Sequence, residues 1–144
     1  MQDAQSLNHT MWECKYHVVF IPKCRKKAIY GQLRKELGKV FRDLARQRDS
    51  EIEEGHLCPD HVHMLISIPP KFSVAQVVGC IEGKSAIDIA RTYQRRKNVR
   101  GHNFWARGYY VNTVGRDEQK VRRYIQRQES EDRRIDQMHL DLDQ

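Results

Sequence analysis

Two histidines separated by a single residue are the first feature of the sequence that could do chemistry. His61 and His63 flank Val62 in the apolar run H-V-H-M-L-I-S-I. In a β-strand the side chains alternate between two faces, so both imidazoles would point to the same side. Two imidazole nitrogens presented together suit a divalent cation with open positions for substrate oxygens. The alternative is that each histidine is an ordinary residue of a half-buried strand.

A tyrosine and a glutamine form the second such feature. Tyr124 and Gln128 are four residues apart in the run V-R-R-Y-I-Q-R-Q, so on a helix the phenol and the carboxamide share one face. A free phenol is a poor nucleophile at neutral pH, but positive charge from Arg123 and Arg127 would favour the phenolate and hold a phosphate. The alternative is a tyrosine that packs its ring on a sheet.

A cysteine precedes the histidine pair and could extend it into a zinc site. Against this, Pro59 and Asp60 make the turn between Cys58 and His61 short, and no fourth ligand is evident. Asp60 could orient an imidazole from outside the ligand set, or could simply be a turn residue. We interpret three further histidines as ordinary strand or loop residues: His17, His56 and His102.

The charge of the chain is unevenly distributed. Residues 1–128 hold 24 Lys and Arg against 13 Asp and Glu, a balance of +11, whereas residues 129–144 hold 2 against 6, a balance of −4. A basic body attracts polyanions by neutralising phosphates and releasing counterions. Nucleic acid is the commonest such partner, although many soluble proteins are modestly basic without one.

The elements that must position these residues follow from hydrophobic periodicity. Alternating or aromatic-rich runs predict four strands, over residues 12–21, 50–57, 61–68 and 104–114. Apolar residues at three- and four-residue steps predict two amphipathic helices, over 33–45 and 74–93, the second with Ser73 as its N-cap. A third helix is expected to begin at Asp117 and to carry Tyr124.

The element order β-α-β-β-α-β plus a terminal helix predicts a ferredoxin-like (RRM-like) α+β fold. Right-handed crossovers would place both long helices on one face of a four-stranded antiparallel sheet. We expect one domain over residues 1–130 and a polar, flexible tail over residues 131–144.

The composition also favours a location in the cytoplasm. No run of eighteen apolar residues is present, and the start M-Q-D-A-Q-S-L-N-H-T lacks the basic-then-apolar order of a secretory signal. The four cysteines contain no C-x-x-C pair, as expected for free thiols in a reducing cytosol. We therefore expect a cytoplasmic protein without a membrane partner.

Several sequence blocks, in this order, resemble a known family. They are K-Y-H-V-V-F-I-P-K, G-H-L-C-P-D-H-V-H-M-L-I-S-I-P-P, K-S-A-I, F-W-A-R-G-Y-Y-V-N-T-V-G and Y-I-Q-R-Q-E, which span nearly all of residues 11 to 130. The chain is similar to the single-tyrosine HUH transposases of the insertion-sequence 200/605 type, whose name denotes His, a bulky hydrophobic residue and His.

The resemblance implies a role for each of the four residues. Tyr124 would be the nucleophile, and His61, His63 and Gln128 would hold Mg²⁺ or Mn²⁺. Such an enzyme cleaves single-stranded DNA with hairpin ends, forms a 5′-phosphotyrosine bond and rejoins the strand without a nucleotide cofactor. The resemblance also suggests a homodimer, and leaves open whether Tyr124 serves the histidines of its own chain or of the partner.

Basic residues near these positions are possible DNA contacts, or else solvated surface. They are Lys23, Arg25, Lys26, Lys27, Arg95, Arg96, Arg107, Arg123 and Arg127. Two other functions remain open at this point: a non-catalytic RRM-like module that binds hairpins, and a related HUH nickase that acts on repeat elements. Neither charge nor fold separates these from a transposase, because all three would share them.

Overall fold

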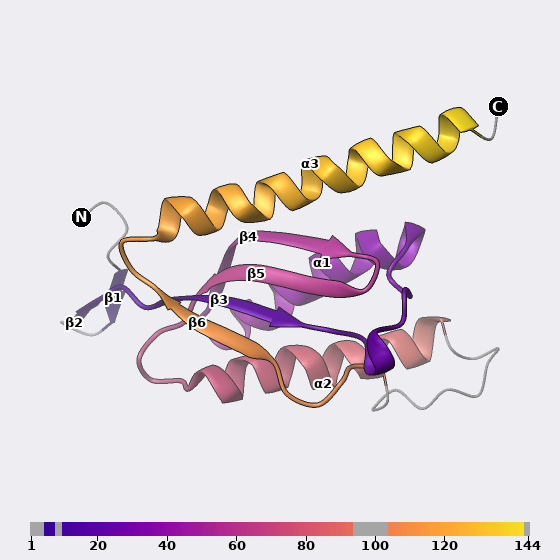
Figure 1. Ribbon diagram of the computed structural model, residues 1–144. Coiled ribbons are helices and arrows are strands. Elements are labelled where there is room, and N and C mark those ends of the chain that lie inside the picture. The colour runs from indigo at the N-terminus through magenta and orange to yellow at the C-terminus, as the bar shows by residue number, and fades with distance from the viewer. Residues whose placement is uncertain (1–4, 8–9, 94–103, 143–144) are drawn as a thin grey trace.

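The computed structural model describes residues 5–7, 10–93 and 104–142, and a four-stranded antiparallel sheet forms its centre (Figure 1). The strands lie in the order β4-β5-β3-β6. Their bounds are Lys15–Phe20 for β3, Glu51–Cys58 for β4, His61–Ser67 for β5 and Tyr110–Val114 for β6. This is the order expected of a ferredoxin-like sheet, so the predicted fold is confirmed.

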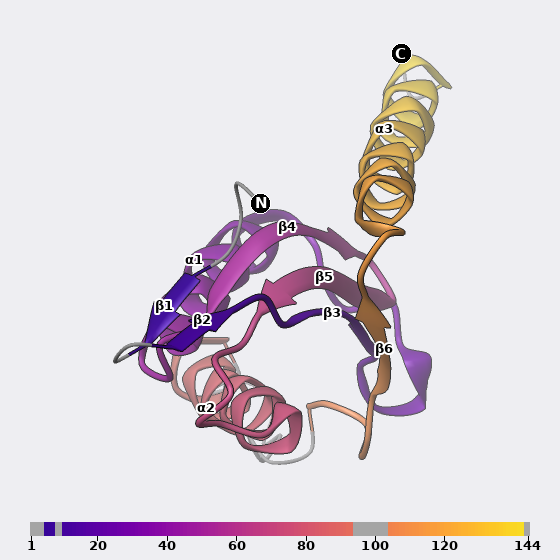
Figure 2. The same cartoon turned by 90° about the vertical axis from the view of Figure 1, so that its left-hand side faces the viewer.

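The first two α-helices cover one face of this sheet, and the terminal helix lies on the other. α1 (Gly31–Arg46) and α2 (Val74–Tyr93) pack against each other beneath the sheet. α3 (Glu118–Leu142) contacts β4 and β5 from the opposite side, as the turned view in Figure 2 shows. Each face of the sheet therefore has its own set of packed side chains.

The face toward α1 and α2 carries the main hydrophobic core. Val18 and Phe20 from β3 and Met64 and Ile66 from β5 point into it and are almost completely buried. Trp105 packs edge-on against Phe20, with 4.8 Å between ring centroids. Trp105 therefore packs against the sheet as part of this core.

Capping defines where the second helix begins. The backbone N–H of Gln76 donates to the Ser73 hydroxyl at 3.0 Å, and the Ser73 N–H donates to the Gln76 side-chain oxygen at 2.8 Å. This reciprocal pair satisfies two donors that a helix start leaves open. Ser73 is thus the N-cap that the sequence predicts.

A β-bulge in β4 changes which residues face α3. The pairing between β4 and β5 shifts between Ile52 and Glu54, so that Ile52 lies opposite Ile66 and His56 lies opposite His63. Without the shift, strict alternation would place His56 on the same face as Ile52. The bulge lets Ile52 pack against the core while His56 faces α3.

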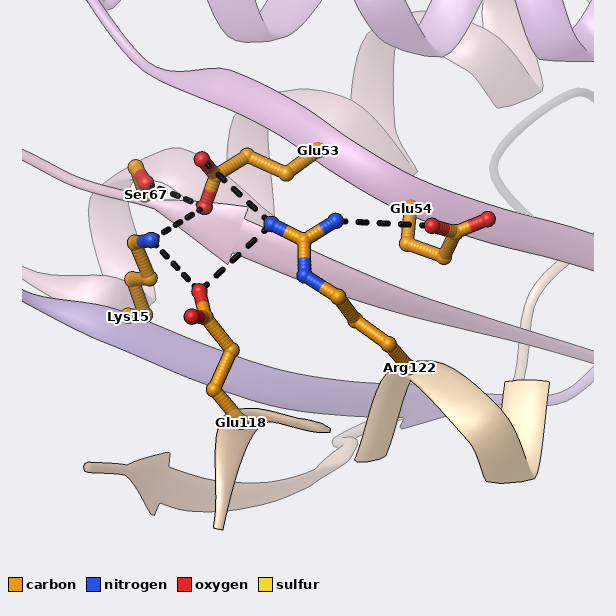
Figure 3. A network of polar contacts seen from close by, with 6 residues as sticks. All are labelled: Lys15, Glu53, Glu54, Ser67, Glu118 and Arg122. Atoms are coloured by element: carbon orange, nitrogen blue, oxygen red, sulfur yellow. Dashed lines mark hydrogen bonds and ion pairs between the residues drawn. The ribbon is translucent and has the colours of Figure 1, made fainter. Parts of the chain in front are cut away.

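A small hydrophobic cluster and a polar network fix α3 to the sheet. Ile125 is completely buried against Leu65 and Val114. At the first turn of α3, Glu118 and Arg122 meet a buried lysine of β3 and two carboxylates of β4 (Figure 3). The members of this network are Lys15, Glu53, Glu54, Ser67, Glu118 and Arg122.

The structure differs from the predicted elements at three places. The first predicted strand is divided, because a hairpin of β1 (Gln5–Leu7) and β2 (Thr10–Trp12) precedes β3. The last strand begins at Tyr110 and not at residue 104. α3 continues to Leu142, so the polar segment predicted as a tail after residue 130 belongs to the helix, where pairs such as Glu129–Arg133 link successive turns.

No helix among the described residues combines the length and the apolar character that crossing a bilayer requires.

Candidate active site

The histidine pair lies on the face of β5 that α3 covers. His61 and His63 are two residues apart on the strand, and their ring centroids are 5.3 Å apart. Val62 between them points into the opposite core. The strand geometry that the sequence predicts for this pair is therefore confirmed, although their role as metal ligands stays a prediction.

His63 is buried and uncharged. Only 1% of its surface is exposed, and its Nε2 has no hydrogen-bond partner among the described residues. Burial, with further contributions from the neighbouring histidines His61, His56 and His17, lowers the pKa of His63 to about 3. A neutral imidazole with a free ring nitrogen is the form that binds metals. The unpartnered Nε2 is the observation in this structure that fits a cation at the site.

His61 is oriented by its neighbour in sequence. Asp60 Oδ1 lies 2.8 Å from His61 Nδ1, and Asp60 Oδ2 accepts a hydrogen bond from Arg25 Nε at 3.2 Å. The hydrogen bond with His61 is the largest influence that lowers the pKa of Asp60. With Nδ1 engaged, Nε2 of His61 is the nitrogen left for a ligand. Asp60 therefore holds an imidazole in place, which was one of its two possible interpretations.

Tyr124 and Gln128 reach this histidine pair from α3. The rings of Tyr124 and His63 lie 5.6 Å apart, and Gln128 Nε2 donates to the Tyr124 hydroxyl at 3.4 Å. About half of the surface of Tyr124, 49%, is exposed, so a substrate can reach it. The structure thus brings together, within one chain, all four residues that the sequence singles out.

Cys58 belongs to the same cluster. Its thiol donates to the Gln128 side-chain oxygen over 3.8 Å, and its Sγ lies within 4.8 Å of a ring nitrogen of each of His61 and His63. The short turn at Pro59 and Asp60 therefore does not keep Cys58 away from the histidines, and that argument against the zinc set is wrong. The reason is that the turn is a hairpin, which pairs Cys58 directly with His61.

Two histidines that the sequence predicts to be ordinary strand or loop residues also line the site. His17 of β3 lies 6.1 Å from both the His63 and the Tyr124 rings, measured between centroids. His56 of β4 lies 6.0 Å from the His63 ring. Alternation along β3 places His17 on the α3 face and could have identified it. His56 could not be found in this way, because the bulge reverses the alternation of β4.

The possible DNA contacts fall into separate groups. Arg123 and Arg127 are exposed and, with Lys120 and Tyr124, line a hollow of about 270 Å³. A second group is exposed on the segment after β3, where Arg25 reaches Asp60, and consists of Lys23, Arg25, Lys26 and Lys27. Arg107 is exposed before β6. Arg95 and Arg96 lie outside the described residues.

Comparisons with known proteins place this chain among its relatives. Residues 10–128 match the family model described as "Transposase IS200 like". The chain is 43% identical over 141 residues to the transposase for insertion sequence element IS200 of Salmonella typhimurium, covering 97% of this chain and 93% of that protein. It is 28% identical over 120 residues to the ISDra2 transposase TnpA of Deinococcus radiodurans, covering 82% and 86% respectively.

Two solved structures share the fold. A putative transposase from Deinococcus radiodurans superposes with a TM-score of 0.70 at 24% identity, over 86% of this chain and 97% of that one. A REP-associated tyrosine transposase bound to a REP hairpin superposes with a TM-score of 0.60 at 14% identity, over 84% and 70%. The family match over most of the chain and the 43% identical relative decide the assignment: this chain belongs to the family of IS200-like transposases.

Proposed function

We propose that this chain cleaves and rejoins single-stranded DNA at the ends of an insertion sequence, through a 5′-phosphotyrosine intermediate on Tyr124. The observation that carries the proposal is the half-exposed phenol of Tyr124 beside the buried, neutral ring of His63. A nucleophile must be reachable by the substrate, whereas a ligand of the cation that would polarise the phosphate is best held rigidly.

The strand-breaking step follows from the groups around Tyr124. The phenol gives its proton to solvent and its oxygen attacks the scissile phosphorus. The bond from phosphorus to the 3′ oxygen breaks, and the 3′ oxygen takes a proton from solvent and leaves as a hydroxyl. The positive charge of Arg123, Arg127 and Lys120 around the hollow stabilises the phenolate and the phosphate. Because the phosphodiester energy is kept in the tyrosine ester, attack by another 3′ hydroxyl reverses the step and joins strands.

The residues that would hold a divalent cation, Mg²⁺ or Mn²⁺, are His61, His63 and Gln128. Such a cation polarises the scissile phosphate when bound. Asp60 keeps the His61 ring in orientation, and the thiol of Cys58 contacts the Gln128 oxygen. Imidazole ligands favour Mn²⁺ or another transition ion over Mg²⁺, which prefers oxygen.

We further propose that the DNA partner carries a hairpin and that the protein is a homodimer. The solved REP-associated relative is bound to a hairpin, and the exposed basic groups on this chain suit a phosphate backbone. For the dimer, β6 is an edge strand on which Tyr110 and Val111 are exposed. An exposed apolar edge is a surface that proteins commonly pair or cover. Light scattering at working concentration tests the dimer, and a monomer would contradict it.

A covalent-adduct assay tests the proposed reaction. Purified protein is incubated with Mn²⁺ and a single-stranded oligonucleotide that carries a hairpin and the end of the element, and the products are separated on a denaturing gel. We expect a protein–DNA band that depends on the metal and is absent for Tyr124→Phe. A chain that binds the hairpin but never forms the band is a binding module and not a transposase.

A further inference from the structure

A second group of metal-binding side chains lies beside the histidine pair and does not include it. It consists of His56 and Cys58 on β4 and Asp132 on α3, and one ligand atom from each lies within 4.8 Å of the others. His56 and Cys58 are buried, with 6% and 2% of their surfaces exposed. His56 Nε2 and Asp132 Oδ2 already meet at 2.7 Å. Three donors from two elements thus converge at one point.

The chemistry of this donor set favours one kind of cation. One thiolate, one imidazole and one carboxylate form a mixed sulfur, nitrogen and oxygen set of the kind that Zn²⁺ takes in tetrahedral sites. Zinc bonds of about 2.0–2.3 Å place the ligand atoms of a tetrahedral site about 3.3–3.8 Å apart. Side-chain rotations that move the ligand atoms by about 1 Å therefore bring all three within bonding distance of one cation. Charge also balances, because a thiolate and a carboxylate together neutralise a divalent cation. The fourth position of the tetrahedron can go to water.

We propose that His56, Cys58 and Asp132 form a zinc site that fastens α3 to β4, separate from the His61–His63 pair. Asp132 lies eight residues, about two helical turns, after Tyr124. A bond between Asp132 and the sheet through the cation restrains the same helix that carries the tyrosine. Zinc at this site therefore has a structural role, and the site does not depend on the proposed DNA chemistry.

One charged neighbour opposes the cation. Arg34 of α1 places Nη2 3.4 Å from His56 Nε2. Its guanidinium must move away when zinc binds, and it has room to do so because it borders a cavity of about 500 Å³ between α1, β4 and α3. Removing this positive charge should strengthen zinc binding, which gives a variant with the opposite effect from the loss of a ligand.

The thiol of Cys58 could instead bind a cation together with the histidine pair. Cys58, His61 and His63 also bring their ligand atoms within 4.8 Å. One Cys58 sulfur serves both sets, so a cation held by one set withdraws it from the other. An experiment must therefore follow the thiolate bond while each set is removed in turn.

Cobalt substitution on the full-length chain makes this test. After chelation and reduction, Co²⁺ is titrated, and the sulfur-to-cobalt charge-transfer absorption reports the thiolate ligand. We expect this absorption for the unaltered chain and for the His61→Ala/His63→Ala variant, and its displacement by Zn²⁺ in both. Cys58→Ser should remove it, and the matched control Cys80→Ser, on α2, should keep it.

The affinity series then identifies the other ligands. Loss of a residue that only hydrogen-bonds a metal ligand already weakens metal binding about 10- to 100-fold. Asp132→Asn removes a ligand itself and should weaken Co²⁺ binding at least as much, whereas Arg34→Ala should strengthen it. Zn²⁺ should raise the melting temperature of the His61→Ala/His63→Ala variant but not that of Asp132→Asn. Because Asp132 is partly exposed, Asp132→Asn keeps the test valid even if a Cys58 variant fails to fold.

Two results would overturn the proposal. One is loss of the thiolate absorption in His61→Ala/His63→Ala while Asp132→Asn retains it, which would assign Cys58 to the histidine pair. The other is the absence of thiolate absorption in the unaltered chain. Neither result bears on strand cleavage, since the readout is metal binding and not DNA chemistry.

Discussion

The ring of Tyr124 lies edge-on to the ring of His63, with 5.6 Å between centroids and 81° between ring planes. One ring comes from α3 and the other from β5, 61 residues earlier in the chain. Their relation depends on how α3 is seated on the sheet. Ile125, next to Tyr124, is completely buried beneath the helix and fixes its rotation.

The polar network at the start of α3 should contribute to this seating. Glu118→Ala removes one carboxylate from a cluster in which Lys15 and Arg122 are shared among Glu53, Glu54 and Glu118. We expect a loss of about 1–3 kcal/mol in the free energy of unfolding, measured in urea, because the buried Lys15 loses one of its partners. Adduct formation should fall more than DNA affinity does.

A matched variant farther along α3 controls for the loss of a glutamate as such. Glu131 pairs with Arg134 on the exposed surface of the same helix. Glu131→Ala should leave the urea midpoint unchanged within error, since exposed ion pairs contribute little. Equal destabilisation by both variants would mean that the buried network has no special role.

The histidine pair should be needed for cleavage and not for binding. His61→Ala or His63→Ala should reduce Mn²⁺-dependent cleavage by at least about a hundredfold, because each removes a proposed ligand. Hairpin affinity, measured by mobility shift, should change little, since phosphate contacts elsewhere carry it. Parallel loss of binding and cleavage in a folded variant would instead indicate a structural role for the pair.

Binding should weaken steeply with salt. The balance of +11 on residues 1–128 predicts release of counterions when phosphates are neutralised, so the logarithm of the affinity should fall linearly with the logarithm of the salt concentration. Mobility shifts over a salt series measure the slope. Arg127→Ala should make the slope shallower, and an affinity that ignores salt would remove the electrostatic argument.

The carboxyl group of Glu82 should make stability depend on pH. Burial raises the pKa of Glu82 from 4.5 to about 7, and its Oε1 has no hydrogen-bond partner among the described residues. The folded state therefore favours the protonated form. This contribution is fully present below pH 4.5 and is lost as the pH rises through about 7.

Urea unfolding near pH 5 and near pH 8 measures this effect. Relative to Glu82→Gln, the free energy of unfolding of the unaltered chain should be lower by about 1–3 kcal/mol near pH 8 than near pH 5. Asp43→Asn, at an exposed position on α1, serves as the control. If the difference in free energy of unfolding between the unaltered chain and Glu82→Gln is the same at both pH values, Glu82 is already ionised in the folded state near pH 5.

The sequence predicts much of the fold and the centre of the site, because both depend on local periodicity. The alternation of β5 places His61 and His63 together, and the helical spacing places Tyr124 beside Gln128. Three-dimensional pairing decides the rest. His56 faces α3 only because the bulge near Glu53 shifts the register of β4, and a bulge leaves no periodic signal.

The length of α3 is a second case in which local composition misleads. Residues after 130 are polar and acidic, which is typical of a flexible tail, yet the helix continues to Leu142. Salt bridges between successive turns, such as Arg133 with Glu129, and the contact of Asp132 with His56 support it. Of these two kinds of contact, the one between Asp132 and His56 joins the end of α3 to the sheet. That contact depends on the position of His56, which the sequence does not predict.

The identity of the nucleophile is the most direct test of the proposed reaction. The adduct formed with a hairpin oligonucleotide is digested, and mass spectrometry locates the residue that carries the nucleotide. We expect the nucleotide on the peptide that contains Tyr124, and no adduct for Tyr124→Phe although that variant still binds DNA. Tyr110 is also exposed, and its ring lies 6.3 Å from that of His17, so Tyr110→Phe is the matched control and should form the adduct normally. A nucleotide on Tyr110, or an adduct that persists in Tyr124→Phe, would contradict the assignment.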